Sequence, residues 1–276
     1  MKIKTFLSAL LLMVSSLASA QYLNVKLEDG TYRSFKTTPK MKVSFGDKAG
    51  AEIMDPVQVV KLYKGDKVVA EYWYHEFDRI VYEEIPPTTG TANAVINDVV
   101  TPVNWVQLWK GGPKFAEYNV GATSATEYGG YYAWGGSQDK VDDQNTGTVA
   151  LFGDSDTATK LWGNKWRMPT QAELQALLTN CDVQWTDDYK GDNTNIKGAI
   201  FTGKQGTAFA SNSVFLPAAG HSASGSFIGQ GGHGYFWSST PNGGNNAYIL
   251  YFVAGRQDVS NFLRSYGCSV RAVLKE

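Results

Sequence analysis

Gly163-Asn-Lys-Trp-Arg-Met-Pro-Thr-Gln-Ala-Glu-Leu174 is the stretch of sequence that says most about the fold. Thr170 and Glu173 have the spacing of a capping box, in which each side chain accepts a hydrogen bond from the other residue's backbone N–H at the start of a helix. Pro169 keeps the chain from becoming helical any earlier. Three leucines follow at the spacing that buries one face of a helix, and Asn180 can end it. The stretch therefore predicts one helix, from just after Thr170 to about Asn180.

Five more blocks of aromatic and small residues surround this stretch. They are Tyr118-Asn-Val-Gly-Ala122, Tyr131-Tyr-Ala-Trp-Gly135, Phe215-Leu-Pro-Ala-Ala-Gly220, Tyr235-Phe-Trp-Ser-Ser-Thr240 and Gly267-Cys-Ser-Val-Arg-Ala-Val273. With these blocks in this order, from about Val103 to the C-terminus, the chain resembles the Fibrobacter succinogenes major paralogous domain. That family is abundant in secreted and surface proteins of Bacteroidetes. The resemblance points to a scaffold and not to a ligand.

The family's fold is similar to that of C-type lectins, so the resemblance implies an α+β fold class: a C-type-lectin-like domain, preceded here by a small all-β N-terminal domain. It also implies that the first and last strands of the domain pair, residues 105–109 against 268–273. Trp166, Arg167 and Trp237 would then belong to the core and its frame. Formylglycine-generating enzymes share the fold, but their paired cysteine site is missing because Cys268 stands alone in its block. Their activity is therefore not implied.

The first 20 residues read as a secretory signal peptide. Lys2 and Lys4 precede an apolar run from Phe6 to Leu17, and Ala18-Ser-Ala20 offers a small-residue cleavage site. The run is too short to span a bilayer, and we expect no transmembrane segment further along because glycine, asparagine or charged residues interrupt every apolar run. The predicted location is therefore outside the cytoplasm: in the periplasm, at the cell surface or secreted.

Two phrases of similar pattern follow, beginning at Val25 and Val60. Each has an alternating apolar-polar run, a glycine turn, a second alternating run and a final strand, which is typical of half-buried strands joined by tight turns. We therefore predict a small β domain with two repeated β units at residues 21–84, in a docking or spacing role. A linker rich in proline, threonine and glycine is expected at 85–101, and the C-type-lectin-like domain at 102–276.

The composition is nearly neutral and strongly aromatic. With 25 Lys and Arg against 26 Asp and Glu, the chain has no basic stripe to neutralise phosphates, so we expect no nucleic acid as a partner. The 29 Gly, 8 Trp, 15 Tyr and 13 Phe, with only 18% charged residues, suit short strands and long ordered loops better than helices. Export permits a disulfide between Cys181 and Cys268, but the sequence leaves open whether they form one.

Motifs for catalysis, metals and cofactors are weak or missing. Residues 220–224 begin like a nucleophile elbow but lack its second glycine. His221 and His233 could approach each other, although no carboxylate stands nearby in the sequence to orient them. We expect no cofactor and no metal site. Asp154 and Asp156 leave open a structural calcium site, although an acidic turn is the favoured interpretation.

What remains is a surface suited to binding. Between Pro241 and Tyr266 the chain carries aromatic and polar residues of the kinds that adaptable binding surfaces use. An ordinary polar loop packed on the domain is the alternative. The predicted ligand-binding residues are Asn245, Tyr248, Tyr251, Arg256, Asp258, Asn261, Phe262 and Tyr266.

The sequence thus favours a non-catalytic binding module of an exported bacterial protein, which recognises a protein or carbohydrate ligand at the cell surface through loops of its C-terminal domain. A structural subunit of a cell-surface assembly, docked through the N-terminal repeats, is the alternative. An enzyme is the least favoured of the three classes. Neither the ligand nor the oligomeric state follows from the sequence.

Overall fold

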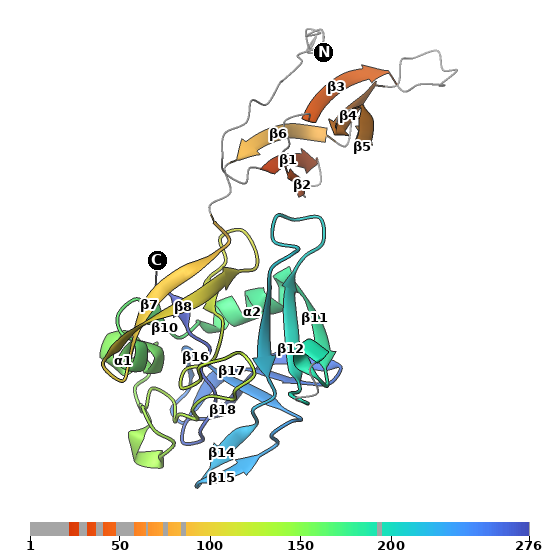
Figure 1. Ribbon diagram of the computed structural model, residues 1–276. Helices are drawn as coiled ribbons and strands as arrows, with labels where there is room; N and C mark the ends of the chain where they lie inside the picture. Colours follow the sequence, from red (N-terminus) through yellow and green to blue (C-terminus); the bar gives the residue numbers. More distant parts are fainter. Residues whose placement is uncertain are drawn as a thin grey trace. The chain divides into compact units, whose positions relative to one another are not determined.

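The computed structural model describes residues 22–27, 32–36, 41–47, 58–64, 66–73, 77–83, 87–191 and 195–275. The signal peptide expected at residues 1–20 lies outside these ranges. The chain divides into two compact units: the first comprises the chain up to Pro86 with Gly206–Ala208, and the second comprises the remainder (Figure 1). In the described part of the chain, no helix is both long and apolar enough to cross a membrane.

The described part of the first unit consists of strands in two antiparallel three-stranded sheets, β2-β1-β6 and β3-β4-β5 (Figure 1). The first repeated phrase supplies β1 to β3, and the second supplies β4 to β6. Each sheet combines a hairpin of one repeat with the last strand of the other, because β6 pairs with β1 and β3 pairs with β4. The two repeats therefore exchange their last strands. The bounds are β1 (Tyr22–Leu27), β2 (Tyr32–Lys36), β3 (Met41–Asp47), β4 (Gln58–Lys64), β5 (Lys67–Trp73) and β6 (Phe77–Glu83).

The second unit is built on a sheet with the strand order β10-β19-β9-β8-β7. Its strands are β7 (Thr89–Ile96), β8 (Val99–Gln107), β9 (Lys114–Ala116), β10 (Trp166–Arg167) and β19 (Val273–Leu274). Two three-stranded antiparallel sheets accompany it, formed by β11 (Cys181–Thr186), β12 (Gly198–Gly203) and β13 (Ser213–Pro217), and by β16 (Gly234–Asn242), β17 (Asn246–Val253) and β18 (Arg256–Leu263). A further hairpin consists of β14 (His221–Ala223) and β15 (Ser226–Ile228).

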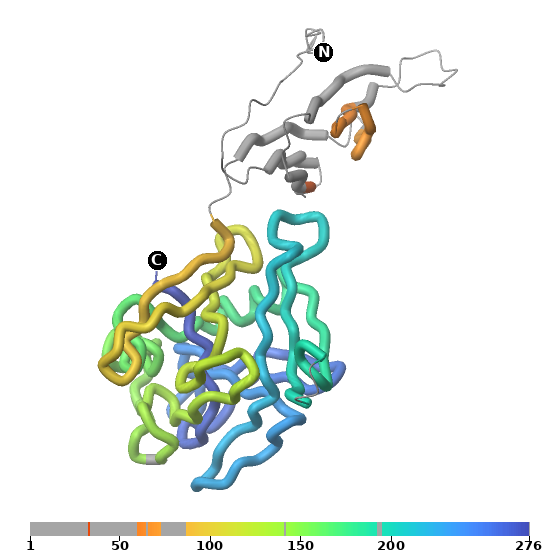
Figure 2. The backbone as a smooth tube through the Cα atoms, viewed as in Figure 1, coloured from red at the N-terminus to blue at the C-terminus, as the bar shows by residue number. Residues whose placement is uncertain are grey.

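Helices are few. The described residues contain the α helices α1 (Thr157–Trp162) and α2 (Gln171–Asn180), with single 3-10 turns η1 (Val141–Asp143), η2 (Gly153–Ser155) and η3 (Tyr189–Gly191). Between β9 and α1 the chain runs mostly as loop, as the backbone tube shows (Figure 2).

The α+β fold class with a C-type-lectin-like domain, which the family resemblance implied, is wrong. The described residues are mostly β, in several antiparallel sheets with two α helices, and they do not form a clear C-type lectin fold. The physical reason lies in the composition. Glycine, aromatic and β-branched residues favour strands and turns over most of the chain, and residues 170–180 alone carry a full set of helix signals. The composition by itself indicates short strands and ordered loops, and the lectin-like class came from the resemblance alone.

Two further expectations differ from the structure. Residues 89–96, assigned to the linker, form β7, which pairs with β8 along its whole length, and the second unit begins at Pro87. The expected pairing of residues 105–109 with 268–273 is also wrong. The strand β9 lies between them, because β19 pairs with β9 and β9 in turn pairs with β8. The two ends of the second unit therefore meet within one sheet, but not as neighbours.

The five-stranded sheet separates two hydrophobic clusters of the second unit. Val103 belongs to one cluster and Phe115 to the other. Trp166 and Trp237 are fully buried in the first cluster, which confirms their predicted place in the core. Their indole N–H groups donate to backbone carbonyls at 3.2 and 2.8 Å, so burying these large rings leaves no donor unsatisfied.

The helix α2 begins with the predicted capping box. Thr170 Oγ1 accepts a hydrogen bond from the Glu173 backbone N–H at 3.1 Å, and the Glu173 carboxylate accepts one from the Thr170 N–H at 2.8 Å. Arg167 donates two more hydrogen bonds to this carboxylate, at 2.8 and 2.6 Å, which ties β10 to the helix. Leu174 and Leu177 are buried, as their spacing predicts.

Removing the cap should destabilise the protein measurably. We expect Thr170→Ala to lower the free energy of unfolding by about 1 kcal/mol, because the Glu173 N–H loses its acceptor. Thr179→Ala is the matched control, since Thr179 lies in the last turn of the same helix and its hydroxyl donates to the Ala176 carbonyl at 3.1 Å. Urea denaturation of both variants is the measurement. If the two variants lost the same free energy of unfolding, the cap would contribute no more to stability than any other threonine of the helix.

Candidate functional site

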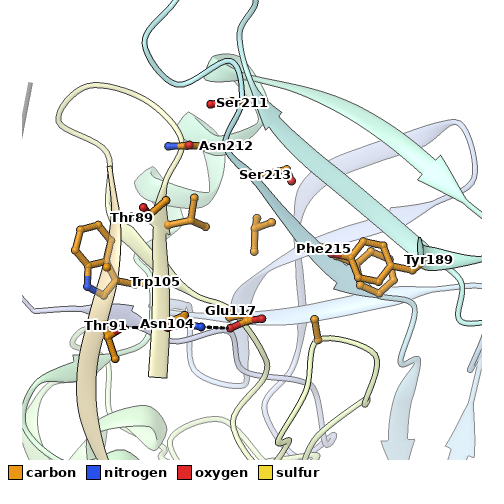
Figure 3. Close-up of a pocket in the computed structure, with 14 residues that line it drawn as sticks. Thr89, Thr91, Asn104, Trp105, Glu117, Tyr189, Ser211, Asn212, Ser213 and Phe215 are labelled. Carbon is orange, nitrogen blue, oxygen red and sulfur yellow. Dashed lines mark hydrogen bonds between the residues drawn. The ribbon is translucent and has the colours of Figure 1, made fainter. Parts of the chain in front are cut away.

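A cavity of about 500 Å³ opens between the β7–β8 hairpin and β13 of the second unit (Figure 3). We call this cavity the cleft. It is lined by Thr89, Gly90, Thr91, Asn104, Trp105, Val106, Glu117, Ala125, Tyr189, Ser211, Asn212, Ser213, Val214 and Phe215.

One side of the cleft is a row of three exposed side chains, Thr91, Asn104 and Glu117, which we call the polar wall (Figure 3). Thr91 and Asn104 are cross-strand partners, and Glu117 follows β9 with its N–H bound to the Asn104 carbonyl at 2.9 Å. The Thr91 hydroxyl donates to Asn104 Oδ1 at 3.0 Å, and Asn104 Nδ2 donates to Glu117 Oε2 at 2.8 Å. The register of the sheet therefore holds three polar side chains in one ordered row.

The ring of Trp105 lies on the other side of the hairpin from the polar wall (Figure 3). Neighbouring residues of a strand point to opposite faces, so Trp105 shares its face with its cross-strand partner Gly90 and not with Asn104. A Cβ atom at position 90 would come within 2.6 Å of the indole. Glycine is therefore needed there for the ring to lie against β7, and the opposite face remains free for a ligand.

The facing side of the cleft is aromatic. Phe215 of β13 stacks on Tyr189 with ring centroids 3.8 Å apart and planes inclined by 4°. Phe215 is buried, whereas Tyr189 is half-buried at the cleft. Ser211 and Ser213 add exposed hydroxyl groups along the same segment (Figure 3). A ligand in the cleft therefore meets polar groups on one side and, on the other, the half-buried Tyr189 ring that Phe215 supports from behind.

A buried guanidinium joins the two sides. Arg271 is 2% exposed and donates hydrogen bonds to the carbonyls of Ala116 at 3.1 Å, Glu117 at 3.0 Å and Phe215 at 2.9 Å, and to Asn119 Oδ1 at 2.9 Å. Burial lowers the pKa of Arg271 to about 9, so the group remains charged at neutral pH. Because the planar guanidinium carries five fixed donors, one side chain ties the segment of Glu117 to the strand of Phe215.

Replacing the Arg271 guanidinium by a group with fewer donors should destabilise the second unit around the cleft. We expect Arg271→Lys to cost about 3 kcal/mol of stability, because a lysine keeps the charge but cannot reach all four acceptors, and buried carbonyls would lose their partners. Arg256→Lys is the control: Arg256 pairs with Asp258 on the surface, where its side chain is 69% exposed, and the same change should cost less than about 1 kcal/mol. Denaturation midpoints of the two variants are the readout, and similar values would contradict the assigned role of Arg271.

The residues predicted from the sequence to bind a ligand lie on or beside β17 and β18, and they do not form one surface. Cross-strand pairing places Tyr251 opposite Asp258, and Tyr248 opposite Asn261. The two pairs point to opposite faces of the sheet because the two tyrosines are three positions apart. Arg256, Phe262 and Tyr266 lie with Tyr251 and Asp258, whereas Asn245 is exposed in the turn before β17.

Three of the predicted residues come together in an aromatic cluster. It consists of His221, His233, Tyr235, Tyr251, Phe262 and Tyr266, with neighbouring ring centroids 4.8 to 6.1 Å apart. Its tyrosines and Phe262 are half-buried, and Tyr235, Tyr251 and Phe262 pack against the first hydrophobic cluster. The aromatic cluster therefore serves the core at least as much as the surface.

The two histidines of this cluster lack the arrangement of a catalytic pair. His233 Nδ1 shares a hydrogen bond with the Tyr251 hydroxyl at 3.0 Å, and His221 Nδ1 is buried without a hydrogen-bond partner. Neither Nδ1 atom is therefore oriented by a carboxylate, as a catalytic imidazole would be. Burial lowers the pKa of His221 below its usual 6.5, the nearby His233 lowers it further, and Asp139 opposes both effects.

The lowered pKa of His221 predicts how stability depends on pH. When the pH falls below 6.5, the ordinary pKa of histidine, His221 takes up a proton in the unfolded chain but less readily in the folded chain. The free energy of unfolding therefore falls as the pH drops through mildly acidic values. We expect His221→Phe, which keeps an aromatic ring among its neighbours, to have a flatter dependence than the parent chain. Urea denaturation at a series of pH values checks this, and identical pH profiles would contradict it.

The two cysteines do not form a disulfide. Both are free and buried, and they lie in different hydrophobic clusters. Burial raises the pKa of the Cys181 thiol to about 12, so it carries little thiolate at neutral pH. Asp156, considered for calcium, caps α1 and accepts backbone hydrogen bonds from Thr159 and Met168. Over the ranges that the structure describes, no group of three or more His, Cys, Asp or Glu side chains is placed to hold a metal ion.

The polar wall was not among the residues predicted from sequence. Thr91 fell in the expected linker, and Asn104 and Glu117 stood among strand residues without a recognisable motif. The alternation of threonine with smaller residues from position 89 was the available signal, since it is a strand pattern. No family model, curated protein or solved structure matches the chain. The resemblance seen in the sequence blocks therefore stays a prediction.

Proposed function

We propose that this chain is a non-catalytic binding module of an exported bacterial protein, and that its second unit recognises carbohydrate in the cleft. The observation that carries the proposal is the polar wall, an ordered row of Thr91, Asn104 and Glu117 that faces the stacked Tyr189 and Phe215. This arrangement offers hydrogen-bonding groups and an aromatic surface to one ligand at the same time.

Carbohydrate has both of the matching surfaces. A sugar ring carries hydroxyl groups around its edge, which amide and carboxylate groups such as Asn104 and Glu117 can bind. It also has patches of C–H groups, which can contact the open edge of the Tyr189 ring, since Phe215 stacks on this ring and Lys190 lies over it. Binding pockets commonly combine a few placed polar groups with aromatic surface. The exposure of the polar wall suits a ligand that arrives from solvent.

The cleft supports binding more than glycoside hydrolysis. Most glycoside hydrolases use two carboxyl groups that flank the bond to be cleaved, about 5 to 10 Å apart. Glu117 is the one acidic residue among the residues lining the cleft. A second carboxyl group to complete the pair is therefore missing from this set.

The cleft is also held in place before a ligand arrives. Arg271 binds the carbonyls of Glu117 and Phe215, on the two sides, and each side chain of the polar wall is bound to its neighbour. Groups that are already ordered lose little conformational entropy when a ligand binds. Weak contacts to a sugar can therefore add up to useful affinity.

The proposed location rests on sequence. Residues 1–20 have the pattern of a secretory signal peptide, and the blocks between Tyr118 and Val273 resemble a family of secreted and surface proteins. We place the protein in the periplasm, at the cell surface or outside the cell on these grounds. A binding role in any of these places brings the cleft into contact with glycans outside the cytoplasm.

Paired asparagine variants separate the cleft from the surface predicted by sequence. In a glycan array followed by calorimetry, we expect Asn104→Ala to weaken binding about tenfold or more, because it breaks the polar wall between Thr91 and Glu117. Asn261→Ala makes the same change at an exposed position of β18 and should alter the affinity less than about twofold.

Each other outcome has a definite meaning. Loss of binding in Asn261→Ala with full binding in Asn104→Ala would move the site to β17 and β18. If the parent chain bound no carbohydrate on the array, the proposed function would be wrong.

A further inference from the structure

The hydrogen bonds of the polar wall run in one direction. The Thr91 hydroxyl donates to Asn104, and Asn104 donates to Glu117, whose carboxylate can only accept. The hydroxyl proton of Thr91 and one amide hydrogen of Asn104 are thus already used. The groups of the polar wall that remain available to a ligand are therefore mostly acceptor oxygens, and the carboxylate of Glu117 supplies most of them.

The other amide in the cleft has also used its donors. Asn212 is buried, and its Nδ2 donates to the Gln107 carbonyl at 2.8 Å and to the Thr88 carbonyl at 3.5 Å. Thr89, Tyr189, Ser211 and Ser213 also line the cleft, and their hydroxyl groups can each donate or accept. The cleft as a whole is therefore richer in acceptors than in donors, and it suits a ligand with the opposite balance.

The charge of the cleft points the same way. Of the residues that line it, Glu117 alone carries a charge. The guanidinium of Arg271 is buried behind the walls and bound to four acceptors. Lys114 lies over the Trp105 ring, on the other face of the sheet, and Lys190 lies over the Tyr189 ring without lining the cleft. A ligand with its own positive charge would complement Glu117.

We infer that the cleft prefers sugars with a free, protonated amine to N-acetylated sugars, and N-acetylated sugars to acidic ones. This inference rests on the proposed recognition of carbohydrate. An ammonium group brings three donors and a positive charge to the acceptor-rich wall. N-acetylation removes that charge and two of the donors, and a uronic acid would bring its carboxylate against that of Glu117.

Three oligosaccharides of equal length test this preference: oligomers of glucosamine, of N-acetylglucosamine and of galacturonic acid. Their affinities for the whole chain are measured by calorimetry at low ionic strength, at a pH where the amine is protonated. Because Glu117 is exposed, we expect the glucosamine oligomer to bind about threefold to fivefold more tightly than its acetylated form. This advantage should shrink as salt is added.

Glu117→Gln isolates the charge. Glutamine has nearly the same shape, and its carbonyl can still accept the hydrogen bond from Asn104. We expect this variant to lose the preference for the amine, so that it binds the glucosamine oligomer and its acetylated form with affinities that agree within about twofold. Glu71→Gln, at an exposed residue of β5 in the first unit, is the matched control and should keep the preference.

The outcomes separate the inference from the function on which it rests. Binding that Asn104→Ala abolishes, but that does not distinguish the amine from its acetylated form, would overturn the inference and leave the proposed function standing. Tightest binding of the galacturonic acid oligomer would overturn it as well. Failure of the parent chain to bind any of the three oligomers or any glycan on the array would remove the proposed function itself.

Discussion

The second unit depends on buried guanidinium groups that bind backbone carbonyls. Arg271 ties the segment of Glu117 to the strand of Phe215. Arg264 lies over the Trp134 ring at 4.2 Å and donates to four carbonyls of the surrounding chain. Long loops leave many carbonyls without the partners that helices and sheets supply, and each one buried unpaired is costly. A planar group with five donors satisfies several of them at once, so a fold with little helix can hold its loops in one conformation.

Local signals in the sequence were enough to predict local structure. The helix after Thr170 follows from its capping box and from the spacing of its leucines. The burial of Trp166 and Trp237, which the structure bears out, was implied by the family resemblance. The fold class was wrong because it came from a resemblance, whereas the composition already pointed to strands. The linker is predicted from Pro86, Pro87 and the threonine and glycine residues that follow them, and it includes residues 89–96. Residues 89–96 nevertheless form the strand β7, which pairs with β8 along its whole length. The Trp105 ring of β8 covers Gly90 and so supplies the large side chain that β7 lacks at this position.

The candidate site was harder to predict because it depends on register. Thr91, Asn104 and Glu117 stand 13 positions apart in sequence and meet only when β7, β8 and the end of β9 align. Conversely, the row predicted along β17 and β18 looked continuous as a list of residue types. The alternation of side chains along a strand divides it, with Tyr248 on one face and Tyr251 on the other. Residue type identified suitable chemistry, and the pairing of strands decided which groups could act together.

The strand exchange in the first unit makes its two repeats dependent on each other. Each repeat taken separately would be a two-stranded hairpin followed by a third strand with no place in its own sheet, and an isolated hairpin is only marginally stable in water. Completing the sheets brings Tyr22 opposite Glu83, so the first and last strands, β1 and β6, must pair before the sheets are complete. The two repeats therefore form a single cooperative element, in which losing either repeat would leave both sheets incomplete.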